Sequence, residues 1–212
     1  MNITILGTGV CATALGKAFA RKNHQLYFGS RTPETKKEWA ATISPSAKVL
    51  SYQEAAASSD VIIVAIPWPG DAVHDALAAA GSLAGKILID ATNVLLEDYS
   101  PRYFENANSG AEEIARLYPE AKVFKAFNSV SGHTLGDNLL QFGDTSITGF
   151  YCGDDEEAKK IVGQLGDDAG LKSLYAGPLK NARHLESLGH LMISLAFGQG
   201  LGVDVGWAYL QR

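Results

Sequence analysis

The sequence predicts a doubly wound α/β fold, in which helices cover both faces of a mostly parallel sheet. Three observations support this prediction. Short segments rich in Val and Ile alternate with helix-like segments along the chain. Most of these short segments are apolar at consecutive positions, as in a parallel strand that is covered on both sides. The chain also opens on a strand, a glycine-rich turn and a helix, which is the unit from which such sheets are built.

Eight segments have the length and composition of buried strands. They are residues 3–6, 25–28, 48–50, 61–65, 87–90, 123–126, 147–152 and 173–175. The helix-like segments are residues 12–21, 33–42, 53–57, 70–80, 110–117, 156–166 and 182–195. Pro33 suits the first turn of its helix, where a backbone N–H is not needed. We therefore expect strands and helices to alternate through the whole sheet.

Two connections, residues 92–109 and 131–142, are long and irregular. Connections of this length are uncommon in compact domains unless they serve a site. A chain of 212 residues suits one domain with a substantial core. We expect that domain over residues 1–180. Residues 181–212 form a short C-terminal helical segment that packs on it and is too short to be an independent domain.

Composition excludes several classes of function. The formal charge is −5 and no basic run stands out, which argues against nucleic acid or an anionic membrane as partner. No stretch of about 18 apolar residues occurs, so we expect no membrane span. The start MNITILG lacks a secretory pattern, and Cys11 and Cys152 form no disulfide or metal pattern. We therefore expect a cytoplasmic protein.

The segment ILGTGVCATALG carries Gly7-x-Gly9-x-x-Ala12, a G-x-G-x-x-G/A pattern. Gly7 permits the tight turn, Gly9 lets the backbone approach a pyrophosphate, and Ala12 lets the helix pack closely on the strand. The helix N-terminus then offers free N–H groups to phosphates. Because the pattern leaves a strand and opens a helix, we predict a dinucleotide site here.

The segment LYFGSRTPETKK indicates which dinucleotide binds. Many such sites place an acidic residue about 20 residues after the fingerprint, where it binds the ribose 2′-hydroxyl. Here Ser30 and Arg31 follow the second strand, with Lys36 and Lys37 one helical turn further on. The planar fork of Arg suits a phosphate. We therefore predict NADP(H) as the cofactor of residues 1–180; the alternative is that these cations are only solvated surface.

Several motifs together resemble the NADPH:coenzyme F420 reductases, the deazaflavin-dependent NADP oxidoreductases. The matching segments are GTGVCATALGKAFA, GSR, VIIVAIPW, DATN, KVFKAFNSVS and GPLKNARHLESLGHL. They span almost the whole chain, and the last two are the most specific. The cytoplasmic reductase domain of the STEAP membrane proteins, in which NADPH gives hydride to a flavin, is similar as well. The resemblance implies a Rossmann-type fold and an NADP-dependent oxidoreductase with a deazaflavin or flavin-type acceptor.

The resemblance also implies which residues bind the cofactor at the carboxyl ends of the strands. Beside the fingerprint residues named above, Thr8, Ser30 and Arg31 would hold the 2′-phosphate end, and the backbone around Val10 and Cys11 would meet the pyrophosphate. Ile66, Pro67 and Trp68 would lie along the ribose and the nicotinamide, and Asn93, Ala126 and Asn128 would border the nicotinamide.

No catalytic residue stands out, because hydride transfer between two bound cofactors needs closeness and orientation more than an acid or base. His133, just past the sixth strand, could donate to a carbonyl of the acceptor, or could be an ordinary loop residue. Trp68 could wall off the nicotinamide or simply pack. Cys11 lies near a helix N-terminus, which would lower the pKa of its thiol, although a packing role is the default.

A metal site is not expected. His184 and His190 are six positions apart, whereas ligands on one helical face lie three or four apart. Arg183 and Glu186 instead have the spacing of an ion pair within one helix.

Three functions remain open: a hydride-transferring oxidoreductase, an NADP(H)-binding sensor without turnover, and a dehydrogenase of small hydroxy or imino acids. The third needs a large helical domain after the sheet, for which too little chain remains. A homodimer is expected, because the short C-terminal segment leaves the cleft open on one flank.

Overall fold

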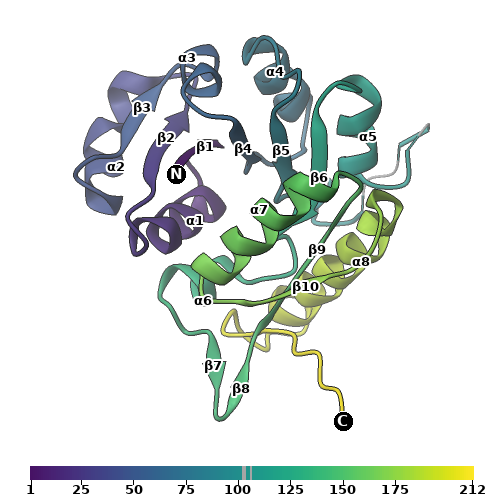
Figure 1. Ribbon diagram of the computed structural model, residues 1–212. Helices are drawn as coiled ribbons and strands as arrows, with labels where there is room; N and C mark the ends of the chain where they lie inside the picture. The colour runs from purple at the N-terminus through teal and green to yellow at the C-terminus, as the bar shows by residue number, and fades with distance from the viewer. Residues whose placement is uncertain (102–103, 106) are drawn as a thin grey trace.

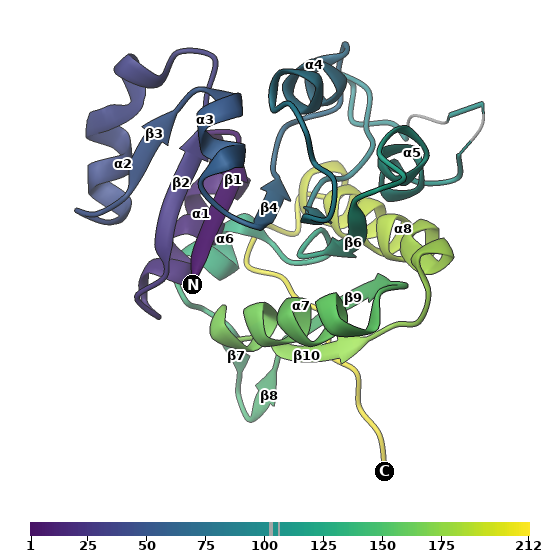
Figure 2. The same cartoon turned by 45° about the horizontal axis from the view of Figure 1, so that its top comes forward.

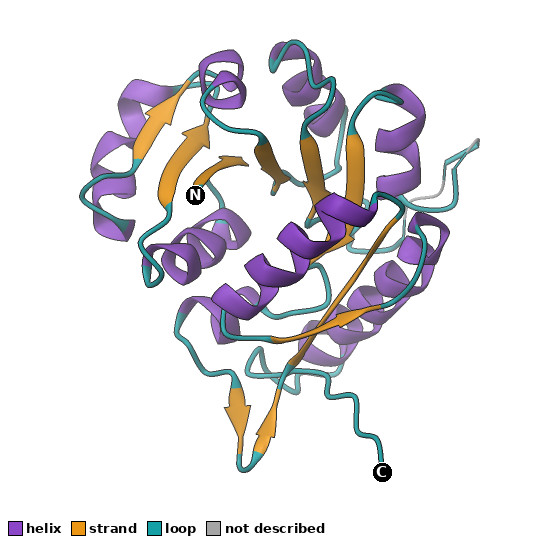
Figure 3. Ribbon diagram, viewed as in Figure 1, coloured by secondary structure: helices purple, strands orange, loops and turns teal. Residues whose placement is uncertain are grey.

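A computed structural model describes residues 1–101, 104–105 and 107–212 of the chain. Its main feature is an eight-stranded sheet in the order β10-β9-β6-β5-β4-β1-β2-β3, with helices packed on both faces (Figures 1 and 3). The strands of this sheet are β1 Asn2–Leu6, β2 Gln25–Gly29, β3 Lys48–Leu50, β4 Val61–Val64, β5 Ile87–Asp90, β6 Lys122–Ala126, β9 Thr148–Gly153 and β10 Lys172–Tyr175. The predicted Rossmann-type fold is confirmed.

Neighbouring strands of this sheet run parallel with one exception, because β9 pairs antiparallel with β6. β10 pairs parallel with β9. β1 pairs with β2 on one side and with β4 on the other. The chain thus moves outward from β1 to β3 and then crosses back to β4. Open α/β sheets bind ligands at the carboxyl ends of the strands where the order reverses in this way.

The helices divide between the two faces of the sheet. They are α1 Val10–Ala20, α2 Lys37–Ile43, α3 Tyr52–Ala57, α4 Ala72–Ala79, α5 Gly110–Leu117, α6 Gly132–Gly136, α7 Glu156–Asp168 and α8 Ala182–Ile193. Helices α1, α2, α6 and α7 contribute to one apolar core, and α3, α4, α5 and α8 contribute to the other. Successive residues of one strand enter opposite cores, as Ile62 and Ile63 of β4 do, so the strands are apolar on both faces.

The turn from β1 into α1 passes close to the end of β4. Gly7 has a φ of +120°, and a Cβ at this position would lie 2.5 Å from the carbonyl oxygen of Ala65. Both the backbone conformation and the lack of space require glycine here. The close approach of two strand ends places the start of α1 directly beside the loop that follows β4.

Three elements differ from the sequence prediction. The predicted helix 33–42 begins with the 3₁₀ turn η1 Pro33–Lys36. The segment 131–142 contains α6, which its glycines concealed because glycine is a poor helix former. It also contains β7 Gln141–Phe142, which pairs with β8 Thr145–Ser146 in a hairpin that projects from the body (Figures 1 and 2).

The C-terminal part returns to the carboxyl ends of the strands. A second 3₁₀ turn, η2 Leu179–Asn181, precedes α8. After Ile193, where α8 ends, the chain forms the π-helical turn η3 Ser194–Gly198. The irregular tail then passes α6 and β9, where the Thr134 hydroxyl and the Thr148 backbone N–H donate to its carbonyl groups. In the described part of the chain, no helix is long and apolar enough to cross a membrane.

Candidate functional site

Two adjoining cavities lie at the carboxyl ends of the strands. The first, called here the phosphate cavity, has a volume of about 560 Å³ and lies over the β1–α1 turn and the end of β2. The second, the apolar cavity, has a volume of about 490 Å³ and lies among the loops after β4, β5 and β6, helix α8 and the C-terminal tail. Both are lined by Gly9, Ala65, Ile66 and Pro67, so they adjoin at these residues and are together called the cleft.

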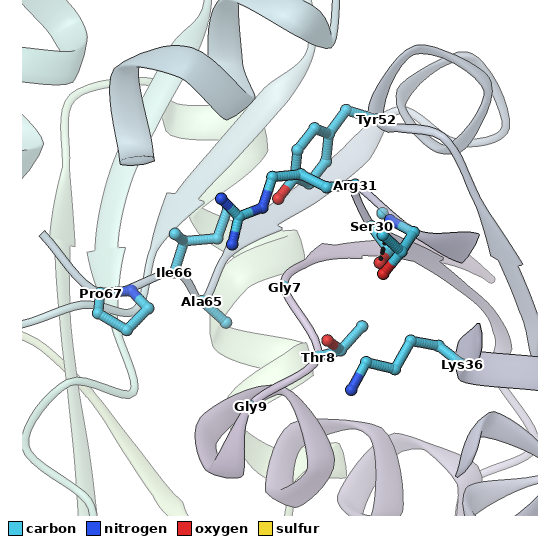
Figure 4. A pocket seen from close by; sticks show the side chains of 12 residues that line it. Gly7, Thr8, Gly9, Ser30, Arg31, Lys36, Tyr52, Ala65, Ile66 and Pro67 are labelled. Carbon is cyan, nitrogen blue, oxygen red and sulfur yellow. Dashed lines mark hydrogen bonds between the residues drawn. The ribbon is translucent and has the colours of Figure 1, made fainter. Parts of the chain in front are cut away.

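The phosphate cavity is lined by hydroxyl groups and cations (Figure 4). Arg31 lies beside the ring of Tyr52, and Lys36 lies on the side of Thr8. Among the described residues, neither Arg31 nor Lys36 has a carboxylate within ion-pair distance. Lys37, in contrast, pairs with Glu34 at 2.5 Å and does not line the cavity. Two cations without an acidic partner make this cavity suited to a phosphate group.

The start of α1 provides a second place for a phosphate. Gly9 is the N-cap of α1, and no side chain caps this end of the helix. A Cβ built on Gly9 would have no atom within 4 Å, so the backbone faces open space. Free N–H groups of a helix N-terminus in such a cradle attract anions. Together the two features fit a dinucleotide that carries a pyrophosphate and an additional phosphate.

Two asparagines form the inner end of the apolar cavity. The Asn93 side-chain amide donates to the Asn128 backbone carbonyl at 2.8 Å. The Asn128 amide donates to Asn93 Oδ1 at 2.9 Å and to the Leu185 carbonyl of α8 at 2.8 Å. Asn128 Oδ1 is buried and has no hydrogen-bond partner among the described residues. A buried acceptor of this kind is costly unless a donor reaches it, and the primary carboxamide of a nicotinamide carries such donors.

The cleft brings together most of the residues singled out in the sequence. They are Gly7, Thr8, Gly9, Val10, Cys11, Ser30, Arg31, Ile66, Pro67, Asn93, Asn128 and His133. Ala12 and Ala126 line neither cavity and are buried in the core. The ring of Trp68 is also buried: its Nε1–H donates to Thr92 Oγ1 at 2.5 Å, and its ring packs on His74 and Phe104. Of the two roles considered for Trp68, the structure shows the packing one.

Cys11 does not have the activated thiol that its place near a helix N-terminus suggested. Burial, with a smaller contribution from Asp90, raises the pKa of the Cys11 thiol to about 12. The expected lowering of this pKa is therefore wrong. Desolvation of the thiolate outweighs the helix N-terminus, so Cys11 lines the cavity as a small, protonated side chain.

The expected ion pair between Arg183 and Glu186 is also wrong. Arg183 instead bonds to Glu112 of α5 at 2.5 Å. Glu186 is turned into the protein, where Glu186 Oε1 accepts from the Lys125 ammonium at 2.7 Å and from the Gly110 backbone N–H at 2.8 Å. Helical spacing allows an ion pair between Arg183 and Glu186, but both side chains bond to residues of other elements. Over residues 1–101, 104–105 and 107–212, no group of three or more His, Cys, Asp or Glu residues could hold a metal ion.

Sequence reasoning missed two features of the site and one buried cluster near it. Tyr52 lines the phosphate cavity from α3, and no motif marked it. The sequence did not distinguish Lys36, which lines the cavity, from Lys37. The third is the buried cluster of Asp90, Lys125 and Glu186 behind the asparagines. A signal existed for two of its members, because Asp90 and Lys125 each stand in an otherwise largely apolar segment.

Comparison with known proteins agrees with this geometry. Residues 2–94 match the family described as NADP oxidoreductase, coenzyme F420-dependent. The F420-dependent NADP reductase of Methanocaldococcus jannaschii is 30% identical, over 97% of this chain and 98% of its own. Metalloreductase STEAP3 of Rattus norvegicus is 32% identical over 88% of this chain, but this region is only 36% of that protein. The crystal structure of a proposed F420-dependent NADP reductase from Arthrobacter sp. FB24 superposes with a TM-score of 0.85 at 27% identity, over the full length of both chains.

The fold, the dinucleotide cleft and the full-length relatives lead to one conclusion. The chain belongs to the family of F420-dependent NADP reductases and is an NADP-dependent oxidoreductase.

Proposed function

We propose that this protein transfers hydride between NADP(H) and a deazaflavin (F420) or flavin-type acceptor that binds in the apolar cavity. The observation that carries the proposal is that the two cavities adjoin and share the lining residues Gly9, Ala65, Ile66 and Pro67. A cofactor bound along this cleft ends beside a largely apolar space suited to a planar aromatic acceptor. The Methanocaldococcus relative, named an F420-dependent NADP reductase, covers the same length of chain and supports deazaflavin as the first choice.

The phosphate end of NADP(H) is assigned to the charged residues of the phosphate cavity. Arg31 and Lys36 supply positive charge to the 2′-phosphate, and Thr8 and Ser30 supply hydroxyl groups. Ser30 is held in place because its Oγ accepts from the Thr32 N–H at 3.1 Å. The start of α1, at Val10 and Cys11, donates backbone N–H groups to the pyrophosphate.

The nicotinamide end is assigned to Asn93 and Asn128. Asn128 Oδ1 accepts from the carboxamide, which removes its unpaired state. When bound, NADPH supplies a hydride, that is, one proton with two electrons. The protein's part is to hold the two reacting rings together and to exclude water. Val130 and Met192, two of the apolar side chains that line this cavity, exclude water. His133 lies exposed at the rim and is the candidate donor to an acceptor carbonyl.

We also propose that the protein is a cytoplasmic homodimer that binds neither nucleic acid nor membranes. Three exposed apolar side chains of α8 and the C-terminal segment support an interface between copies: Leu191 is 49% exposed, Phe197 65% and Leu201 69%. Apolar surface of this kind is typical of contacts between subunits. Sedimentation over a wide range of concentration tests the dimer, and a monomer throughout would contradict it.

Stopped-flow oxidation of NADPH tests the reaction itself. The protein is mixed with NADPH and then with a panel of acceptors: the deazaflavin F420, FMN, FAD and small carbonyl compounds. We expect rapid loss of NADPH absorbance with the deazaflavin or a flavin and none with the carbonyl compounds. If NADPH binds but no acceptor is reduced, the interpretation as a sensor without turnover replaces the enzyme in this proposal.

A further inference from the structure

Three segments on which the family resemblance rests meet in one buried ion cluster. DATN contributes Asp90, KAFN contributes Lys125 and ARHLES contributes Glu186. The side chains of Asp90 and Lys125 are 0% exposed, and that of Glu186 is 6% exposed. Lys125 Nζ lies 2.7 Å from Asp90 Oδ2 and 2.7 Å from Glu186 Oε1. None of these residues lines the cleft, so the proposed reaction leaves their charges unexplained.

The Lys125 ammonium uses all three of its donors on three different segments. Besides the two carboxylates, on β5 and α8, it donates to the Thr92 carbonyl at 2.6 Å. Asp90 Oδ1 in turn accepts from the Thr92 N–H at 2.9 Å and from its hydroxyl at 2.6 Å. Lys125 thereby holds together the end of β5, the turn that follows it and helix α8. A lysine has three N–H donors and no acceptor, so this ammonium is fully satisfied.

Stability alone does not explain a charged cluster at this place. Removal of charges from water is costly, and well-packed apolar residues often stabilise a core as well as a buried ion pair does. Burial alone lowers the pKa of Lys125, but the Asp90 and Glu186 carboxylates outweigh it and hold this pKa above its ordinary value. The ammonium therefore stays charged and keeps three donors in fixed directions. Fixed directions, which apolar packing does not provide, indicate a positioning role.

Both asparagines of the apolar cavity depend on the segments that Lys125 holds. Asn93 directly follows Thr92, whose carbonyl accepts from Lys125. Asn128 donates to the carbonyl of Leu185, the residue before Glu186 on α8. One helical turn later, α8 approaches the pair so closely that a Cβ on Gly189 would lie 2.3 Å from Asn93 Oδ1 and 3.0 Å from Asn128 Nδ2. A shift of α8 would therefore displace the asparagine pair.

We propose that Lys125 is a positioning residue that, through Thr92 and Glu186, sets Asn93 and Asn128 in the arrangement that receives the nicotinamide carboxamide. This inference rests on the proposed function, which places the nicotinamide at these asparagines. It assigns the cluster to one end of the cofactor only. The phosphate cavity lies over β1 and β2 and is independent of Lys125.

The test compares two ligands that share the phosphate end and differ at the nicotinamide end. NADPH carries both ends, whereas adenosine 2′,5′-bisphosphate carries only the 2′-phosphate end. Dissociation constants of both are measured by calorimetry for the wild-type protein and for Lys125→Met, Glu186→Leu and Glu186→Gln. Gln keeps the side-chain oxygen that accepts from Lys125 and Gly110, and Leu removes it. Lys86→Met is the matched control, because Lys86 pairs with Asp60 at the amino end of β5, away from the cleft.

Wild-type protein should bind NADPH more tightly than the bisphosphate. In Lys125→Met and Glu186→Leu, NADPH binding should weaken about tenfold, corresponding to one or two lost hydrogen bonds. Bisphosphate binding should be unchanged in both variants. Glu186→Gln and Lys86→Met should resemble the wild type. Retained bisphosphate binding also shows that a variant is folded.

Two results overturn this inference and leave the proposed function standing. One is an unchanged NADPH preference in Glu186→Leu and Lys125→Met. The other is an equal loss of both ligands, because a cluster that only supports the fold would affect both ends alike. A wild-type protein without any preference for NADPH over the bisphosphate would instead remove the proposed nicotinamide placement, and this inference with it.

Discussion

Replacement of Arg31 by alanine should reduce the preference of the protein for NADPH over NADH. Arg31 and Lys36 are the cations that line the phosphate cavity, and neither has a carboxylate within ion-pair distance in the described part of the chain. A hydrogen bond to a charged group contributes about 1.5–3 kcal/mol. Loss of the Arg31 contact should therefore weaken NADPH binding roughly 10- to 150-fold. Arg31 is exposed and Lys36 remains, so we expect the lower half of this range.

Calorimetric titration with NADPH and NADH measures this effect. NADH lacks the 2′-phosphate, so its affinity should change little in Arg31→Ala. Lys37→Ala is the matched control, because Lys37 is next to Lys36 but pairs with Glu34 outside the cavity. The reasoning is refuted if the wild-type protein binds both nucleotides equally, or if Arg31→Ala weakens both by the same factor.

Three further variants or treatments test other parts of the cleft. Gly132→Trp should block reduction of the acceptor in stopped-flow assays, because Gly132 lines the apolar cavity; an unchanged rate would mean that the acceptor binds elsewhere. Gly7→Ala should lower the free energy of unfolding in urea by about 2 kcal/mol or more, since its φ is +120° and its Cβ would meet the Ala65 carbonyl; an unchanged midpoint would contradict this. Burial raises the pKa of both Cys11 and Cys152 to about 12 from 9.0. Iodoacetamide at pH 8 should therefore label the native thiols about a thousandfold more slowly than unfolded ones. The free energy of unfolding should fall as the pH rises from 9 towards 12, because the unfolded thiols lose their protons before the native ones do. Rapid labelling of the native protein would be inconsistent with these shifted pKa values.

The parts of the site that the sequence predicted depend on local backbone chemistry. The turn at Gly7 and Gly9 follows from the small residues that a strand–turn–helix unit needs. The position of Arg31 is predictable because Arg31 follows the second strand directly, and the sequence predicts the end of that strand to within a few residues. The Rossmann-type fold follows from the alternation of apolar strands with helices. Each of these features is set by residues close together in the chain.

The parts that the sequence did not predict depend on contacts between distant segments. Helical spacing favoured a pair between Arg183 and Glu186, but spacing does not show which face of α8 packs inward. Glu186 instead meets Lys125, 61 positions earlier. Because Glu186 lies on the inward face of α8, Arg183 bonds to Glu112 of α5 instead. The division of the chain at residue 180 stays a prediction.

Transfer of a labelled hydride tests the central claim most directly. Two samples of NADPH, each with deuterium on a different face of the nicotinamide C4, are mixed separately with the protein and F420, and the reduced deazaflavin is analysed by mass spectrometry. A deazaflavin accepts hydride at carbon, so transferred deuterium does not exchange with water. The account predicts that deuterium from one of the two faces appears in the reduced deazaflavin. Oxidation of NADPH without deuterium in the product from either labelled face would contradict hydride transfer, and no oxidation of NADPH at all would exclude F420 as the acceptor.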